Sequence, residues 1–220
     1  MHLIKVGGSL TYFARHLLSE LKIFCSDGSD NGGENKIIVV PGGGAFANVV
    51  RDLNEKGGLN NRSSHKLATM SMDLTGIYFS EISGIKTADN LYDAKKLLEE
   101  ENIVILLPSK IVLSTDELPH SWDITSDSIA AYIARLLNLN NIIIATDVDG
   151  IYDNYPEGKL LNTINAKSIK GFTSVDSYLP KLLLKHNIEC FVVNGKHPGR
   201  IINILKNNND IYTKITIDKK

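Results

Sequence analysis

Apolar residues along the chain fall into two patterns that alternate from end to end. Short uninterrupted runs, rich in β-branched side chains, are typical of strands that are buried on both faces. These runs predict strands at residues 3–6, 37–40, 103–107, 142–145, 190–193 and 215–217. Between them, apolar residues recur three and four positions apart, which predicts helices. The helical stretches lie at about residues 13–24, 45–56, 64–84, 129–137 and 176–186, and a last one begins near Pro198.

Strands that alternate with helices indicate an α/β fold, a three-layer sandwich whose central, mostly parallel sheet is covered on both faces. A chain of 220 residues fits one large domain of this class, and no linker or internal repeat divides it. Residues 26–35, rich in Gly, Ser, Asp and Asn, predict a surface loop, and residues 151–163 predict an irregular excursion. Because ligands of such sheets bind beyond the carboxyl ends of the strands, functional residues are expected there.

Composition narrows the classes of partner. Hydrophobic residues make up 43% and charged residues 22%, with a formal net charge of -1, which favours a globular protein without a nucleic-acid or membrane partner. No apolar run reaches the ~18 residues of a membrane span and no secretory signal is present, so we expect a cytoplasmic protein. Cys25 and Cys190 lie far apart and outside any CxxC spacing, which indicates neither a zinc site nor a disulfide framework.

Two glycine clusters follow the first two predicted strands. Lys5 precedes Gly7-Gly8, and Gly42-Gly43-Gly44 follows Pro41. Backbone N–H groups in such turns can approach a phosphate closely, and the N-terminus of a following helix adds positive potential. A tight turn beside a surface lysine is the simpler interpretation of the first cluster. The second also matches part of a dinucleotide-binding fingerprint, but the acidic residue expected about 20 residues later is missing.

Four further polar segments lie beside predicted elements. Residues 122–128 begin a helix with Thr125 or Ser126 as N-cap, yet they hold five Asp, Ser or Thr residues where a cap needs one. Residues 146–152 follow a buried strand and suit nucleotide or metal contacts, although a plain turn has the same composition. Lys181 lies in a first helical turn, where a cation is unfavourable unless an anion is near. Residues 193–200 form a strand-to-helix turn whose first interpretation is structural.

Missing motifs exclude other enzyme classes. The chain has no GxxxxGK[ST] loop, so it is not a P-loop NTPase. Its six histidines show no metal-binding spacing, and no Ser-His-Asp or Cys-His set can be identified. His65, at the start of a predicted helix, is interpreted as a surface or pocket-wall residue and not as a catalytic one.

The order of the segments is more specific than any single motif. It runs from KVGGSL through PGGGAFAN, TSDSIA and TDVDGIY to a late lysine and an Asn-Gly turn. This set resembles the amino-acid kinase superfamily over nearly the whole chain. Within it, the chain is most similar to the small archaeal aspartokinase-related group, as judged from PGGGAFANVVRDL, HKLATMSMD, SWDITSDSIAAYIARLL, VDSYLPKLL and FVVNGKHPGRI. It departs from the family at residues 209–214, which replace the usual Gly-Thr turn before the last strand.

The resemblance implies a carbamate-kinase-like fold and one kinase domain over residues 1–220, with the acceptor in the N-terminal part and the nucleotide from about residue 140. It implies ATP and Mg²⁺ as cofactors, a homo-oligomer, and a small phosphomonoester as acceptor. The most specific acceptor that it implies is [5-(aminomethyl)furan-3-yl]methyl phosphate, converted to its diphosphate in methanofuran biosynthesis. The alternatives are isopentenyl phosphate or UMP as acceptor, and a non-catalytic anion-binding protein of the molybdate-storage type.

The resemblance also assigns residues by position. Lys5 and Lys181 would flank the transferred phosphoryl group, and Asp127 would hold both lysines. The nucleotide would be bordered by Gly7, Gly8, Thr146, Asp147, Asp149, Gly150 and Tyr152. The acceptor side would comprise Gly42, Gly43, Gly44, Asn48, Arg51, Trp122 and Asp123. No residue is assigned to a protein-bound metal.

Overall fold

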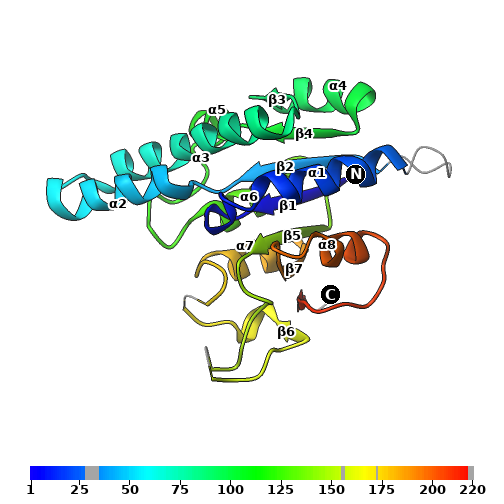
Figure 1. Cartoon of the computed structure of the whole chain (residues 1–220). Helices are drawn as coiled ribbons and strands as arrows, with labels where there is room; N and C mark the ends of the chain where they lie inside the picture. The colour runs from blue at the N-terminus through cyan, green and yellow to red at the C-terminus, as the bar shows by residue number, and fades with distance from the viewer. Residues whose placement is uncertain (28–34, 155–156, 172, 218–220) are drawn as a thin grey trace.

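The computed structural model describes residues 1–27, 35–154, 157–171 and 173–217 (Figure 1). Within these residues, eight strands form one sheet in the order β3-β4-β2-β1-β5-β7-β8-β6. The strands are β1 (His2–Val6), β2 (Ile37–Pro41), β3 (Thr87–Ala88), β4 (Ile103–Leu106), β5 (Asn141–Thr146), β6 (Thr163–Asn165), β7 (Glu189–Asn194) and β8 (Thr213–Thr216).

Helices occupy the connections between these strands and cover both faces of the sheet (Figure 1). The α-helices are α1 (Ala14–Asp27), α2 (Gly44–Gly57), α3 (Asn61–Ser83), α4 (Leu91–Glu101), α5 (Ser109–Thr115), α6 (Ser126–Leu136), α7 (Leu179–His186) and α8 (Pro198–Leu205). Short 3₁₀ helices are formed by η1 (Gly8–Leu10) and η3 (Ala166–Ser168).

The sheet separates two apolar cores because successive side chains of a strand point to opposite faces. Leu3 and Val40 contribute to the core that α6 and α7 cover. Ile4 and Val39, the alternate residues, contribute to the core that α1 and α8 cover. Burial on both faces explains why the strands read as continuous apolar runs in the sequence.

The strand order positions the glycine clusters. The sheet is parallel from β3 to β7, while β8 runs antiparallel to β7 and β6 runs parallel to β8. β1 pairs with β2 on one side and with β5 on the other. The chain order therefore reverses at β1, and a ligand crevice is expected at the carboxyl ends of the strands at such a point.

The predicted fold class is confirmed, and the structure adds elements that the apolar pattern did not predict. β3, α4, α5 and β6 are short or start from polar residues, so they carry little periodic signal. In α4, the Asn90 side chain accepts the Asp93 N–H at 2.9 Å and begins the helix. α7 begins at Leu179 and not near 176, and the Asp176 carboxylate accepts the Leu179 N–H at 2.8 Å. Of the predicted loop at 26–35, residues 28–34 lie outside the described residues.

None of the helices in the described part of the chain combines the length and the apolar character that a bilayer span requires. Cys25 and Cys190 are both buried and unpaired by disulfide. Burial raises the pKa of the Cys25 thiol to about 12, so this thiol stays protonated at neutral pH.

The last strand is retained despite the altered turn at residues 209–214, and Thr213 anchors it. The Thr213 hydroxyl donates to the Leu161 carbonyl at 2.6 Å and accepts the Ile151 N–H at 2.8 Å. Thr213 is fully buried, and Gly150 packs so closely that a Cβ there would lie 2.4 Å from its hydroxyl oxygen. One hydroxyl thus ties β8 to the excursion after β5.

Replacing Thr213 with Val should lower the free energy of unfolding by about 2–3 kcal/mol. The substitution keeps the shape but leaves a buried N–H and a buried carbonyl unpaired. Urea denaturation measures the change. Thr216→Val is the matched control, since the Thr216 hydroxyl makes only a 3.4 Å contact with the Ile164 carbonyl. Equal losses for both variants would contradict the anchoring role of Thr213.

Candidate active site

The two glycine clusters meet at the carboxyl ends of β1 and β2. The Gly42 N–H donates to the Val6 carbonyl at 2.7 Å, and the Gly7 N–H donates to the Ala145 carbonyl at 2.8 Å. A Cβ on Gly8 would lie only 2.4 Å from the Gly44 backbone nitrogen. The clusters are therefore in backbone contact, and this approach is possible only because side chains are absent.

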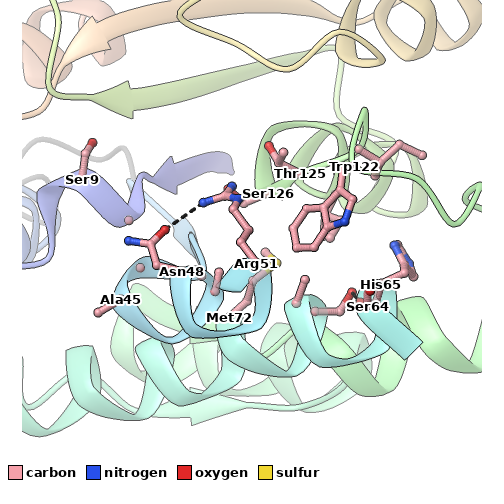
Figure 2. Close-up of a pocket in the computed structure, with 18 of the residues that line it drawn as sticks. Ser9, Ala45, Asn48, Arg51, Ser64, His65, Met72, Trp122, Thr125 and Ser126 are labelled. Carbon is pink, nitrogen blue, oxygen red and sulfur yellow. Dashed lines mark hydrogen bonds between the residues drawn. The ribbon is translucent and has the colours of Figure 1, made fainter. Parts of the chain in front are cut away.

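A cavity of about 580 Å³ opens beside this contact (Figure 2). Its walls come from η1, α2, α3, the loop before α6 and the start of α6. Lys5 and Arg51 supply positive charge, and none of the described residues that line it is acidic. A concave surface with one sign of charge concentrates ligands of the opposite sign, so the cavity suits an anionic ligand.

Lys5 forms a buried ion pair at this cavity. Its Nζ lies 2.7 Å from Asp127 Oδ1, and both side chains are 8% exposed. Asp127 lies in the first turn of α6, where the helix dipole favours negative charge. A buried charge without a partner is very costly, so removing either side chain would leave the other buried without its partner.

Asp176, which carried no assignment, holds the segment around this pair. Its carboxylate is fully buried and accepts hydrogen bonds from residues at the starts of both α6 and α7. Its own N–H donates to Asp127 Oδ2 at 3.1 Å. Burial, and then the nearby Asp127 charge, raise the pKa of Asp176, while its hydrogen bonds oppose that rise. The sequence signal was an Asp three residues before a helix, which is typical of a cap.

Lys181 differs from the expected arrangement. It lies in the first turn of α7 with an exposed side chain, and its Nζ is 5.1 Å from the centroid of the Tyr178 ring. It forms no ion pair with Asp127, whose contacts are Lys5 and the Asp176 N–H. The expectation that Asp127 holds both lysines is therefore met for Lys5 alone. The catalytic role of Lys181 stays a prediction.

The acceptor-side candidates separate into two groups. Asn48, Arg51 and Trp122 line the cavity together with Gly43 and Gly44 (Figure 2). Arg51 Nη1 donates to Asn48 Oδ1 at 2.8 Å, and the Arg51 guanidinium lies 5.5 Å from the centroid of the Trp122 ring. These contacts arrange three of the predicted side chains over one cavity. The others, Gly42 and Asp123, lie outside its lining.

A network of side-chain hydrogen bonds holds Trp122 in place. With its amide oxygen toward the indole, Asn54 accepts the Trp122 Nε1–H at 3.3 Å, and its NH₂ group donates to Ser64 Oγ at 2.6 Å. Asn54 belongs to α2, Ser64 to α3, and Trp122 to the loop before α6. The network therefore fixes the indole across the α2/α3 pair, as a rigid wall of the cavity.

Five of the nucleotide-side candidates lie at the end of β5 or after it and outside the lining of this cavity, whereas Gly8 lines it. Asp149 is not free: it accepts from Arg200 at 2.5 Å and from Asn194 at 3.0 Å. Burial alone would raise its pKa, but these hydrogen bonds and the Arg200 charge hold it below the usual value. Gly150 packs on Thr213, and Tyr152 forms a bridge with Leu160. Thr146 pairs with Asn194 at the end of β5, and the exposed Asp147 follows it. Nucleotide contacts for this group, and for Gly7 and Gly8, stay a prediction.

His65 lies in the wall of the cavity, as predicted (Figure 2). Its ring centroid is 5.0 Å from that of His120, and His120 Nε2 lies 2.8 Å from Asp116 Oδ1. Burial, and then the neighbouring His120, lower the pKa of His65. His65 is therefore neutral at pH 7 and adds no positive charge to the cavity.

Comparison with known proteins identifies the family. The amino acid kinase family model matches residues 1–203. The chain belongs to the amino acid kinase family. A [5-(aminomethyl)furan-3-yl]methyl phosphate kinase from Methanocaldococcus jannaschii is 53% identical over 220 residues, covering 100% of this chain and 100% of the relative. A uridylate kinase from the same organism is 26% identical over 78% of this chain and 79% of its own length.

Solved structures show the same fold. A uridylate kinase from Archaeoglobus fulgidus superposes with a TM-score of 0.73 at 17% identity, covering 98% of this chain and all of the other. An isopentenyl phosphate kinase from T. acidophilum gives a TM-score of 0.61 at 20% identity, covering 99% of both chains. The predicted resemblance to the amino acid kinase superfamily is thus confirmed.

In this amino acid kinase, sequence reasoning missed the contribution of α3 to the cavity. The residues that it adds to the lining besides His65 are Asn61, Ser64, Ala68, Thr69 and Met72. All of them except the exposed Asn61 are buried or half-buried, and the side chains of Ser64, Ala68 and Thr69 are small enough to leave room for a ligand. This run of small residues on an otherwise apolar helical face was the available signal.

Gly8→Ala should abolish turnover by the amino acid kinase and lower the free energy of unfolding by about 1–3 kcal/mol. The added methyl group would meet the backbone of Gly44, which has no flexible end to move aside. Gly199→Ala is the control, because a Cβ there meets nothing within 4 Å. Thermal unfolding and ADP release measure both effects. A fully active Gly8→Ala variant would contradict the proposed closeness of the clusters.

Proposed function

We propose that this protein is an ATP-dependent kinase that phosphorylates [5-(aminomethyl)furan-3-yl]methyl phosphate to its diphosphate in methanofuran biosynthesis. The observation that carries the proposal is the cavity at the glycine clusters, whose lining in the described part of the chain contains Lys5 and no acidic residue. The 53% identity to a kinase named for this acceptor supports the choice of substrate.

The site suits transfer between two phosphates. Phosphoryl transfer needs little covalent help, so positioning and charge stabilisation dominate the catalysis. Lys5 stands at the cavity, with its ammonium group fixed by Asp127. Backbone N–H groups at the glycine clusters add donors that need no reorganisation during the reaction. In this proposal, Lys181 approaches the transferred group from the nucleotide side, at the start of α7.

Mg²⁺ would enter with the nucleotide. Among the described residues, no group of three or more His, Cys, Asp or Glu side chains could hold a metal ion. Mg²⁺ commonly binds substrate phosphates with few protein ligands, and it neutralises charge on the phosphates of ATP. We assign the nucleotide itself to the segments after β5, which lies next to β1 in the sheet, and after β7, which lies next to β5.

The acceptor side also suits a small heterocyclic phosphate. Trp122 offers an aromatic wall for a planar ring, and Arg51 and Lys5 offer positive charge for the acceptor phosphate. UMP and isopentenyl phosphate are the alternative acceptors, and the uridylate kinase relatives are only 23–26% identical. The relatives named here are kinases, which favours catalysis over a storage function.

Turnover tests this proposal directly. ADP release is measured with ATP, Mg²⁺ and each of the three phosphomonoesters, and the aminomethylfuran phosphate should give the highest kcat/KM. Lys5→Ala and Lys181→Ala should each lower turnover about 30- to 1,000-fold, the equivalent of ~2–4 kcal/mol in the barrier. Lys185→Ala, an exposed lysine on the same helix as Lys181, is the matched control.

The outcomes separate the parts of the proposal. A higher kcat/KM for UMP or isopentenyl phosphate would show that this compound, and not the aminomethylfuran phosphate, is the acceptor. Unchanged turnover in Lys181→Ala would show that Lys181 has no catalytic role. The absence of Mg²⁺-dependent turnover with every acceptor would overturn the kinase function.

We also propose that the protein forms a homo-oligomer through the outer faces of α2 and α3. Large apolar side chains on these helices are 37–60% exposed, at Phe46, Val49, Leu53, Leu67, Met70, Leu74, Ile77 and Tyr78. Their spacing of three and four residues places them opposite the residues that line the cavity. An apolar face of this extent is unusual on a monomer.

The ends of the α3 stripe favour a second copy as the partner. Exposed Lys66 precedes the stripe and exposed Glu81 follows it, at nearly equal distances from Leu74. Two α3 helices packed antiparallel about a two-fold axis near Leu74 would bury both stripes and pair each Lys66 with the partner's Glu81. Self-complementarity of this kind is what a two-fold interface requires.

Leu74→Lys should convert the oligomer to a monomer, because it would place two charges in the buried centre of the interface. Light scattering after size-exclusion chromatography measures the mass. Ile23→Lys, at an apolar side chain on α1 that is about equally exposed, should keep the wild-type mass. A wild-type monomer at micromolar concentration, or an oligomeric Leu74→Lys variant, would contradict this interface.

A further inference from the structure

One buried carboxylate joins two helices that carry different parts of the proposed active site. Asp176 Oδ2 accepts the Thr125 and Ser128 N–H groups at 2.8 and 3.0 Å and the Thr125 hydroxyl at 2.9 Å. Asp176 Oδ1 accepts the Ser128 hydroxyl at 2.6 Å and the Leu179 and Tyr178 N–H groups at 2.8 and 3.2 Å. The four donors of Thr125 and Ser128 lie at the start of α6, and the two N–H donors of Tyr178 and Leu179 lie at the start of α7.

The same two segments are tied by further bonds. The Tyr178 N–H donates to the Asp123 carbonyl at 3.2 Å, and the Ser177 hydroxyl donates to the Asp123 carboxylate at 3.1 Å. The Asp176 N–H donates to Asp127 Oδ2 at 3.1 Å. Asp123 adjoins Trp122 of the acceptor cavity, and Asp127 holds Lys5. The link therefore reaches the acceptor wall and the catalytic ion pair together.

A cap for one helix does not account for this arrangement. An N-cap needs one acceptor at one helix start. Here six donors converge on one carboxylate that has no exposed surface. Four come from Thr125 and Ser128, about 50 positions earlier in the chain, and two come from the nearby Tyr178 and Leu179. Four of the donors are backbone N–H groups, which cannot turn into acceptors. The two helix N-termini favour the negative charge that burial disfavours.

We propose that Asp176 is a positioning residue that sets the distance between the Lys5–Asp127 pair on the acceptor side and Lys181 on the nucleotide side. The inference rests on the proposed function, because it concerns how that site is assembled. Asp176 does not touch the reacting groups. It acts by making the start of α6 and the start of α7 one rigid unit, with Asp127 on one helix and Lys181 on the other.

Asp176→Asn tests this link. The asparagine has the same shape, but in either orientation its NH₂ group faces N–H and O–H donors and pushes the two helix starts apart. We expect kcat to fall about 10- to 100-fold, because small misplacements of catalytic groups have effects of this size, with smaller changes in both KM values. Ser128→Ala is a milder second variant, since it removes one donor and keeps the carboxylate.

A double-mutant cycle distinguishes positioning from a general loss of stability. If Asp176 acts by placing Lys181, Asp176→Asn should lower kcat much less when Lys181 is already alanine. The fold decrease in kcat should then be at least about fivefold smaller than in the wild-type background. Asp73→Asn is the matched control: Asp73 accepts the Ser109 N–H at 3.0 Å at the start of α5 and is not itself a lining residue of the cavity. Its effect should be equal in both backgrounds.

Hydrogen exchange of the full-length protein supplies a readout that does not need turnover. Asp176→Asn and Ser128→Ala should speed exchange of amides at 125–129 and 178–182, and leave 109–115 unchanged. Unchanged exchange, or equal factors in both arms of the cycle, would overturn the inference. A wild-type protein without turnover would overturn the proposed function instead, and exchange would still decide whether Asp176 joins the helices.

Discussion

The buried ion pair between Lys5 and Asp127 is the constraint on which the site depends. Lys5 stands near the end of a strand that has neighbours on both sides, and Asp127 stands in the first turn of a helix packed on that strand. Neither charge is stable there alone. The sheet, α6 and the glycine backbone must therefore assemble together before the ammonium group can face the cavity.

The glycine clusters allow this geometry because they have no side chains. With no Cβ at Gly8 and Gly44, the turns after β1 and β2 touch, and the ends of both strands form the floor of one cavity. The α2 and α3 helices then supply the wall, with polar and small residues facing the cavity and large apolar residues facing outward.

Much of the site followed from residue order. Lys5, Gly43, Gly44, Asn48, Arg51 and Trp122 were named from the sequence and line one cavity, and Gly8, which was assigned to the nucleotide side, lines the same cavity. The contribution of α3 was missed because periodicity identifies a buried helical face but not what that face meets. Lys181 was named correctly as a residue of a first helical turn, yet its contact with Asp127 is absent. Position along a helix does not determine where a long, flexible side chain points.

Local patterns in the sequence were enough to predict the class of fold, the family and the turns where backbone could approach phosphate. Those patterns are apolar runs, helical spacing and glycines at the ends of strands. That Asp176 joins α6 to α7 and that Asn54 holds Trp122 became visible only in the folded chain. Such contacts join residues far apart in the chain, and a carboxylate or amide looks the same in sequence whether it caps one helix or bridges two. The partners of a buried polar group are chosen by packing, which no local pattern encodes.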